Sequence, residues 1–431
     1  MIYFLVTIFL LSLSIFLTHK IRFLSIYRIP PSLIAGASVL LLFTFSTNAR
    51  DSAYFLSLKE LPSIFIAFVF ACLFLQKPPN DGISRNLSKI VFAQTALVWV
   101  SIMGQVIIAL LATIFIYRPF FQLPIVFTSI LETGFAGGHG TAVAMGPILQ
   151  LNGLPSGLDF GLFSATVGLI CGTLGGIGLI HRRRKHIDYE KAVDDPKPIN
   201  ISFETLAITL GLIALAYLSG SAIKALIENI FLSSLQLPEI ARKIQIPLFV
   251  YTLVTGYLVR KIIQWTKHDH LISTGIIMVL GDFFLEILIF AGIATINVLL
   301  IESALFPLMT LFTLGFLWNL FCHRFLLPKF LPIQYHFDIG LINFGMLNGT
   351  TATGLMLLKM YDPHYRTPAA KVYAQSAALT QPLIGGGLLT LATPYILNAV
   401  SANIAVLFFS LLFGFWFLVG IYFSRKIKSA K

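Results

Sequence analysis

Long runs of apolar residues, separated by short polar stretches, follow one another along the whole chain. A helix needs about 20 apolar residues to cross a bilayer, whereas a spanning β-strand shows as a short segment of alternating polarity. The runs here are long and unbroken, so they predict membrane-spanning helices rather than a barrel. We expect spans near residues 1–17, 31–45, 61–75, 90–117, 157–180, 206–227, 246–259, 271–300, 305–321, 372–397 and 402–423.

Two further segments, residues 124–150 and 337–360, are apolar enough for the membrane but rich in Gly, Thr and Asn. Backbone that leaves helical geometry at membrane depth survives only where protein buries it or where it lines a cavity. We therefore interpret both segments as re-entrant or broken-helix hairpins.

The two halves of the chain share one order of features. Gly140-Thr141-Ala142 in the first hairpin is matched 209 residues later by Gly349-Thr350-Thr351 in the second. Gly175-Gly176 is matched at nearly the same offset by Gly385-Gly386. Because each pair lies in the same order along its half, the pattern indicates an internal duplication.

The longest polar linker lies between these halves, and a proline opens a span in each of them, one reaching Gly36 and the other Gly256. The predicted organisation is a first repeat at 1–186 with its hairpin at 124–150, a cytoplasmic linker at 187–200, a second repeat at 201–400 with its hairpin at 337–360, and an extra span with a basic tail at 401–431.

Composition supports a membrane protein. Hydrophobic residues make up 57% of the chain and charged residues only 11%, whereas a soluble domain carries about 25% charged residues. This excludes a soluble enzyme, a disordered chain and a disulfide scaffold. The predicted fold class is an all-α polytopic membrane protein, with two inverted-topology repeats of about five spans each and one extra C-terminal span.

The distribution of basic residues predicts the orientation. With the N-terminus outside, the layout places twenty-four of the 30 Lys and Arg residues inside and a cytoplasmic C-terminus follows. The two repeats then run in opposite directions, which is typical of transporters. Since the basic clusters are short and lie between spans, they do not indicate a nucleic-acid partner. The six basic residues expected outside are Arg50, Lys59, Arg118, Lys224, Arg242 and Lys243.

The first hairpin holds the sharpest candidate site. Its glycines let the backbone leave helical geometry, and a broken helix exposes N–H groups that favour an anion and C=O groups that favour a cation. His139 could donate to a carboxylate or orient the loop, and Thr141 could cap the restarting helix or touch a solute. The alternative is a tight packing motif in which His139 bonds a neighbouring backbone. The predicted substrate-binding residues here are Gly137, Gly138, His139, Gly140 and Thr141.

The corresponding stretch of the second hairpin provides neutral donors and acceptors, which suit an ion or a polar solute without burying charge. Hydroxyl groups in membrane helices also often bond their own helix, so a purely structural role is the alternative. The predicted substrate-binding residues here are Asn348, Gly349, Thr350, Thr351 and Thr353.

Three acids in apolar surroundings are candidate cation ligands: Asp282 and Glu286, which share a helix face, and Glu132, just before the first glycine motif. An acid at membrane depth should face a cavity or a partner. The alternative is a position near an interface, or pairing with a basic residue such as Lys267. The sequence carries no ATP-binding or metalloprotease motif, and His139 has no Cys or His neighbour. We expect no catalytic residue, no cofactor and no metal beyond Na⁺ as coupling ion. A membrane enzyme using His139 and Glu132 would need a further reactive group, so we expect no enzyme.

The motif from Gly137 to Thr141, followed by the glycine-rich span at 160–176, resembles the bacterial sodium/glutamate symporter family (ESS family). The stretch at 27–36 looks like that family's first-repeat entry, and residues 349–353 are similar to its second loop. The resemblance implies Na⁺-coupled uptake of glutamate by a multi-pass protein of the cytoplasmic (inner) membrane, with an inverted-repeat fold and a homodimer. It also implies that the two motifs form the substrate and ion region.

The chain departs from this family in ways that identify a divergent member. The family's second loop is richer in glycine and carries a proline, whereas Asn348 and Ala352 stand here without one. Asp282 and Glu286 fall where neutral residues are expected. The alternatives are a carboxylate carrier of different specificity, or a cation/proton exchanger on the same scaffold that uses Asp282 and Glu286.

Overall fold

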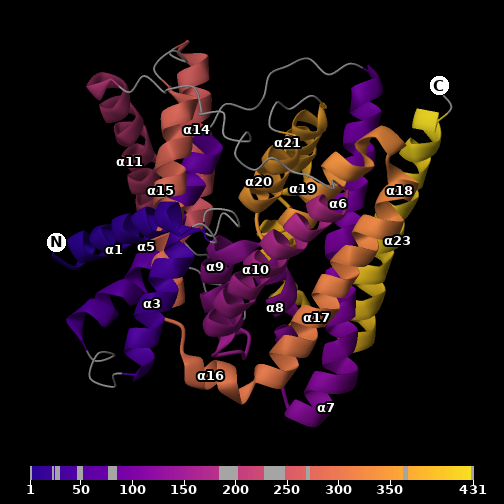
Figure 1. Cartoon of the computed structure of the whole chain (residues 1–431), viewed down its shortest axis with the longest axis horizontal. Helices are drawn as coiled ribbons and strands as arrows, with labels where there is room; N and C mark the ends of the chain where they lie inside the picture. The colour runs from indigo at the N-terminus through magenta and orange to yellow at the C-terminus, as the bar shows by residue number, and fades with distance from the viewer. Residues whose placement is uncertain are drawn as a thin grey trace. The chain divides into compact units, whose positions relative to one another are not determined.

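The computed structural model describes residues 2–21, 24, 30–45, 52–75, 85–183, 202–227, 248–267, 272–362 and 367–428, and these contain helices and no strand (Figure 1). The predicted linker at 187–200 lies outside the described residues. Within the described part, eight helices are long and apolar enough to cross a membrane: Ile2–Lys20, Ala53–Cys72, Leu87–Phe121, Gly157–Arg183, Phe203–Leu226, Thr274–Ala294, Leu305–Phe330 and Ala402–Ile427. The prediction of a polytopic α-helical membrane protein is therefore confirmed.

The chain forms two compact units, and each unit draws on both halves of the sequence. The first unit comprises residues 1–19, 30–80 and 195–295, and the second comprises 20–29, 81–194 and 296–431. The predicted repeats are defined by duplication along the sequence, whereas the compact units are defined by contacts in space. The units therefore do not test the repeat boundaries, which stay a prediction.

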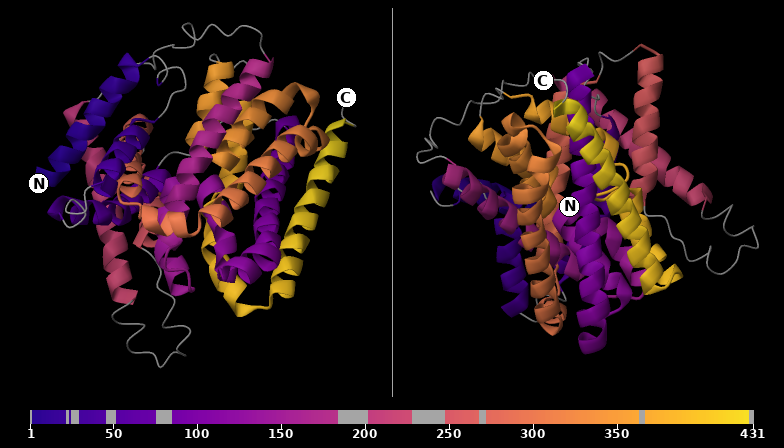
Figure 2. Two further views of the ribbon diagram at one scale, coloured as in Figure 1. Left: turned by 60° about the horizontal axis from the view of Figure 1, so that its bottom comes forward. Right: turned by 90° about the vertical axis from the view of Figure 1, so that its right-hand side faces the viewer.

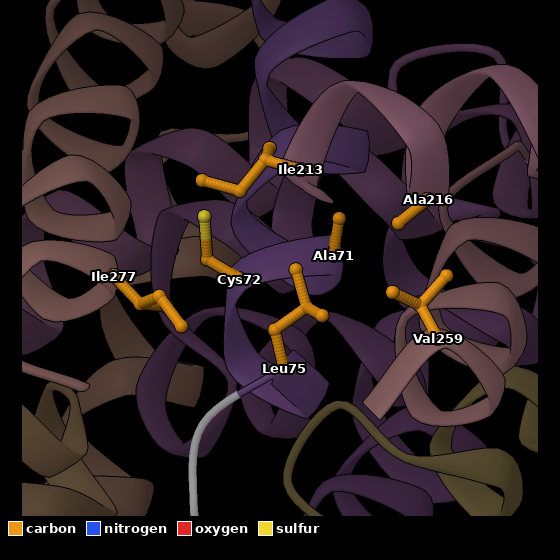
Figure 3. Close-up of a cluster of buried hydrophobic side chains, with 7 residues drawn as sticks. All are labelled: Ala71, Cys72, Leu75, Ile213, Ala216, Val259 and Ile277. Atoms are coloured by element: carbon orange, nitrogen blue, oxygen red, sulfur yellow. The ribbon is translucent and has the colours of Figure 1, made fainter. Parts of the chain in front are cut away.

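The first unit packs around an apolar core. Ala71, Cys72 and Leu75 meet Ile213, Ala216, Val259 and Ile277 there (Figure 3). A Cβ atom on Gly256 would lie 2.9 Å from the Ala71 carbonyl oxygen, so only glycine allows that approach. The helices of this unit are α1 (Ile2–Lys20), α3 (Pro31–Phe45), α5 (Ala53–Leu75), α11 (Phe203–Leu226), α14 (Leu248–Trp265) and α15 (Thr274–Ala294).

The second unit contains both predicted hairpins. Its longest helix, α6 (Arg85–Ala112), lies alongside α23 (Ala402–Lys428) (Figures 1 and 2). Trp99 of α6 stacks on Trp416 of α23 with ring centroids 5.0 Å apart. The other helices are α7 (Arg118–Phe121), α8 (Ser129–Leu131), α9 (Gly138–Leu151), α10 (Gly157–Arg183), α16 (Val298–Ser303), α17 (Leu305–Phe321), α18 (Leu327–Phe330), α19 (His336–Asn348), α20 (Thr351–Tyr361), α21 (Ala369–Thr380) and α22 (Leu388–Ala399).

One predicted span is wrong. Residues 372–397 were expected to form one continuous helix, but the chain breaks between α21 and α22. Two glycines at the break, Gly385 and Gly386, have φ of +67° and +105°. These left-handed conformations cannot continue a right-handed helix, and glycine adopts them without a steric penalty. The spans predicted at 31–45 and 246–259 form α3 and α14, which are not among the eight membrane-spanning candidates.

Candidate functional site

The first hairpin breaks at Gly137 and Gly138. A 3₁₀ segment, η2 (Ile125–Thr128), is followed by α8 and by a π-helical segment, η3 (Glu132–Ala136), before α9 begins. Gly138 has φ of +70°, which interrupts the helix. Gly137, at the N-cap of α9, supplies no side-chain acceptor for the first N–H groups of that helix. The predicted break is confirmed, and the new helix start keeps its N–H groups free of a side-chain cap.

The second hairpin breaks at Gly349 and Thr350. Thr350 is extended, and its hydroxyl oxygen accepts a hydrogen bond from the Thr353 N–H at 3.3 Å, so it caps α20. A Cβ on Gly345 of α19 would lie 2.7 Å from the Cα of Gly354 in α20. The two arms therefore touch directly, as expected for a helical hairpin.

The two breaks meet. A Cβ on Gly138 would lie 2.6 Å from Thr350 Cγ2 and 3.4 Å from the Gly349 carbonyl oxygen. The break between α21 and α22, which we call the third break, lies at the same point, because a Cβ on Gly386 would overlap the hydroxyl oxygen of Thr141. Residues that are far apart in sequence thus form one junction of three interrupted helices.

Helix α10 supports this junction with a stripe of glycines. A Cβ on Gly168 would overlap the Asn348 carbonyl oxygen and lie 3.1 Å from a ring atom of Phe135. One on Gly161 would lie 3.2 Å from Ala142. Helix α10 therefore contacts both broken segments, which explains the glycine-rich pattern of this span.

Helix dipoles give the junction its electrostatic character. Both α9 and α20 begin there, and helix starts carry partial positive charge together with unpaired N–H groups. Helix α19 ends there, and its carbonyl end already has partners. The Leu347 carbonyl oxygen accepts hydrogen bonds from Gln105 Nε2 and from Asn319 Nδ2, each at 3.0 Å. The start of α9 therefore has no side-chain cap, whereas Thr350 caps the start of α20 and amide donors neutralise the end of α19.

The structure gives the predicted residues of the first motif mainly internal partners. His139 is 2% exposed, and its Nε2 lies 3.0 Å from the Thr166 hydroxyl. Thr166 donates its only hydroxyl proton to the Leu162 carbonyl oxygen, so His139 Nε2 is the donor to Thr166. Thr141 donates to the Gly137 carbonyl oxygen at 2.9 Å. His139 thus orients α9 on α10, and Gly140 lies in the first turn of α9.

Both polar side-chain atoms of Asn348, in the second motif, have a hydrogen-bond partner. Its amide donates to the Phe344 carbonyl oxygen at 2.8 Å and its Oδ1 accepts from Asn319 at 2.9 Å. Thr351 has a different environment, because its hydroxyl bonds Tyr373 OH at 2.9 Å and accepts from Gln381 Nε2 at 2.8 Å. A contact of these residues with a solute stays a prediction.

The three candidate acids lie in different units. Glu132 belongs to η3 beside the first break and is 1% exposed, and its Oε1 accepts the Thr390 hydroxyl at 2.6 Å. Glu286 lies in the other unit, where its Oε2 accepts the Ser32 N–H at 3.1 Å at the start of α3. Asp282 is exposed on α15. The structure therefore places one of the three acids at the junction.

Sequence reasoning missed five residues around the junction. Each is a polar residue within an apolar run, which was a usable signal, but their partners lie in distant segments that no spacing rule identifies. Gly385 and Gly386 had been noticed only as a repeat match. The missed residues are Gln105, Asn319, Tyr373, Gln381 and Thr390.

A family model described as sodium/glutamate symporter matches residues 1–365. The chain belongs to the sodium/glutamate symporter family. No curated protein matches the chain in a sequence search. Members of this family are symporters, so the chain is a multi-pass membrane transporter, which agrees with the expectation that it is not an enzyme. Helices α21, α22 and α23 lie beyond the matched residues.

Proposed function

We propose that the protein is a secondary active transporter that couples Na⁺ to the symport of glutamate, or of a related anionic amino acid or carboxylate, by alternating access. The observation that carries this proposal is the junction of the two hairpins, where Gly138 lies against Thr350. Ligand sites made of interrupted helices are the usual arrangement in secondary transporters.

The helix starts at the junction suit an anionic solute. The first N–H groups of α9 have no side-chain cap, and a carboxylate is the natural partner for them. Thr350, Thr351 and Thr353 add hydroxyl groups at the start of α20. His139 acts by holding α9 in place through Thr166. We therefore assign the solute carboxylate to the start of α9, with the threonines of α20 on its other side.

A repeated succession of elements supports an inverted repeat. The π segment η1 (Thr113–Tyr117), α7 with Pro119, and η2 lead into the first hairpin. The π segment η7 (Cys322–Leu326), α18 with Pro328, and the 3₁₀ segment η8 (Ile333–Tyr335) lead into the second. The two π segments are separated by 209 residues, as are Gly140 and Gly349.

The first unit offers a second sign of the same relation. Gly36 of α3 packs against Ile293 of α15, and Gly256 of α14 packs against Ala71 of α5. The second span of each half thus packs on the third span of the other half, as a pseudo-twofold axis requires. We propose inverted repeats, an outside N-terminus and a cytoplasmic C-terminus in the inner membrane, and, from the family resemblance, a homodimer.

Uptake into proteoliposomes tests the proposal. Purified protein should accumulate labelled glutamate, aspartate or a related dicarboxylate when an inward Na⁺ gradient is imposed, and a choline gradient of equal size should not drive uptake. Failure to transport any anionic amino acid or carboxylate under the Na⁺ gradient would contradict the proposal.

The cation/proton exchanger has less support. Glu286 is engaged with the backbone of α3, and both it and Asp282 lie in the unit without broken hairpins. If this alternative holds, Na⁺ should drive proton movement without any organic solute, and Asp282→Asn should abolish it.

A further inference from the structure

Glu132 is a buried carboxyl group that no charged residue bonds in the part of the chain that the structure describes. It is 1% exposed, and among the described residues its hydrogen-bond donors are the Thr390 hydroxyl and the Gly385 backbone, which are both uncharged. A carboxylate in such surroundings carries a large desolvation penalty unless a positive charge compensates it. An ionised Glu132 therefore requires a cation beside it, whereas a protonated Glu132 does not.

Three hydroxyl groups without hydrogen-bond partners among the described residues lie within four residues of Glu132 along the chain. Thr128 lies one helical turn before Glu132, and Ser129 and Thr133 lie on the same segment. Their hydroxyl oxygens are buried and have no hydrogen-bond partner among the described residues. Helix α22, which carries Thr390, packs against η2, α8 and α9. Several oxygens that lack partners among the described residues thus lie on the segment that carries Glu132, where a cation could use them as ligands.

Backbone groups of the first and third breaks also lie close to Glu132 and Thr390. Segment η3 ends at Ala136, where the negative end of a helix dipole lies. The Ala136 carbonyl oxygen would be 3.7 Å from a Cβ on Gly385. Thr390 also links this interface to the third break, because its hydroxyl accepts the Gly386 N–H at 3.1 Å while it donates to Glu132.

The second break does not offer the same chemistry. Its Leu347 carbonyl oxygen already accepts two amide donors, and Asn348 Oδ1 accepts another from Asn319. A carbonyl with both lone pairs engaged is a poor cation ligand. The two breaks therefore differ: three buried hydroxyl groups without partners lie at the first, whereas at the second the Gln105 side chain leaves only its Oε1 without a partner among the described residues.

We propose that the coupling Na⁺ binds between the first and third breaks, on the Glu132 carboxylate and the neighbouring hydroxyl oxygens, with Thr390 holding the carboxylate. This inference rests on the proposed function, which it deepens by assigning the ion to one of the breaks. It also gives the segment beyond the family-matched residues a direct part in ion coupling.

The geometry supplies a route from ion to solute. A Cβ on Gly386 would overlap Thr141 Oγ1, so the third break rests on the first turn of α9. An ion on Glu132 stabilises the placement of Gly385 and Gly386 through Thr390, and hence the start of α9. The solute carboxylate assigned to that start then binds more tightly with Na⁺ present, and linkage requires the reciprocal effect.

Ion binding by the purified full-length protein, without organic solute, tests this site. Thermal stability is measured while NaCl replaces choline chloride at constant ionic strength, since a ligand that binds the native state raises the unfolding temperature. Glu132→Gln keeps the acceptor for Thr390 but removes the charge. It should raise the Na⁺ midpoint, which is the Na⁺ concentration that gives half of the maximal stabilisation, about tenfold or more. Thr390→Val should weaken Na⁺ binding several-fold. Two matched controls should leave the Na⁺ midpoint unchanged. Glu302→Gln changes an exposed acid, and Thr313→Val removes an exposed hydroxyl that bonds the Met309 carbonyl oxygen of its own helix.

An unchanged Na⁺ midpoint in Glu132→Gln would overturn the assignment. If that variant also loses the pH dependence of uptake, Glu132 is a proton carrier instead. Should Glu132→Gln fail to fold, Glu132→Asp and Thr390→Val provide the same comparison. If the wild-type protein binds Na⁺ through Glu132 but transports no carboxylate, the proposed function fails while this site stands.

Discussion

At the scale of single residues, buried side-chain amides decide how the second break is held. Gln105 and Asn319 lie on different helices and both donate to the Leu347 carbonyl oxygen. Without the break, that carbonyl would accept an N–H from the next turn of the helix. The two amides replace the missing donor, so a polar residue that looks isolated in α6 completes the structure of α19.

Gln105→Leu should therefore destabilise the protein and weaken solute binding. It removes the Gln105 bonds to Leu347 and Asn319, each worth about 1–3 kcal/mol when a buried partner is left unpaired. A lower unfolding temperature and reduced Na⁺-driven uptake should accompany one another. Gln150→Leu, at an exposed position near the end of α9, is the control and should change neither. Wild-type behaviour of Gln105→Leu would show that these bonds do not hold the break.

Gly138→Ala should nearly abolish uptake. The new Cβ would occupy a left-handed conformation, which costs ~1–2 kcal/mol, and would lie 2.6 Å from Thr350 Cγ2. The matched variant is Gly178→Ala in α10, where a Cβ meets nothing within 4 Å, and it should retain uptake. Both proteins should be compared at equal amounts in the membrane. Equal activity would argue against a solute site formed by this junction.

At the scale of elements, α21 holds the start of α20. Tyr373 and Gln381 both bond Thr351, the first residue of that helix. The break after α21 allows Gln381 to lie beside Thr351 while α22 continues toward Glu132. A continuous helix over residues 372–397 could not contact both hairpins. The glycine triplet at 385–387 provides the break that lets α21 contact the second hairpin and α22 contact the first.

Tyr373→Phe should raise the KM for the transported anion several-fold, because it removes one hydroxyl bond of about 0.5–1.5 kcal/mol and keeps the ring. The maximal rate should change less, since the variant disturbs solute placement and not the break itself. Tyr422→Phe, at an exposed ring on α23, is the control. The measurement is initial uptake over a range of glutamate concentrations. An unchanged KM would show that Thr351 takes no part in solute binding.

At the scale of the whole molecule, neither half of the sequence contains a complete core. In the first unit, Ala71, Cys72 and Leu75 come from before the linker, and Ile213, Ala216, Val259 and Ile277 come from after it. In the second unit, the first break comes from one half and the other two breaks come from the other. Each unit forms only when both halves are present.

Separate expression of residues 1–190 and 196–431 should give two unstable proteins. Each would leave the packed faces of its helices without partners, so both should aggregate in detergent or be degraded rapidly. Co-expression of the two pieces should restore a particle that runs as one species on size exclusion and transports solute. A stable, monodisperse product from either piece alone would contradict the interleaved arrangement.

Much of the candidate site could be predicted because its signals are local. The glycine cluster at 137–140 and its Gly-Thr match at 349–350 predict helix breaks, and both breaks are present. The break at 385–387 was missed because its neighbours are as apolar as those of a continuous span. Thr390 and Gln105 were missed because a single hydroxyl or amide does not indicate which distant atom it will meet.

The sequence by itself determined that this is a multi-pass helical membrane transporter and where two of its helices are interrupted. Both follow from local rules, namely the length of apolar runs needed to cross a bilayer and the backbone freedom of glycine. The tertiary structure alone decided that three breaks meet, that Gln105 and Asn319 neutralise one of them, and that Glu132 pairs with Thr390. Those contacts join residues up to 258 positions apart, and they depend on how helices pack, which no pattern along the chain encodes.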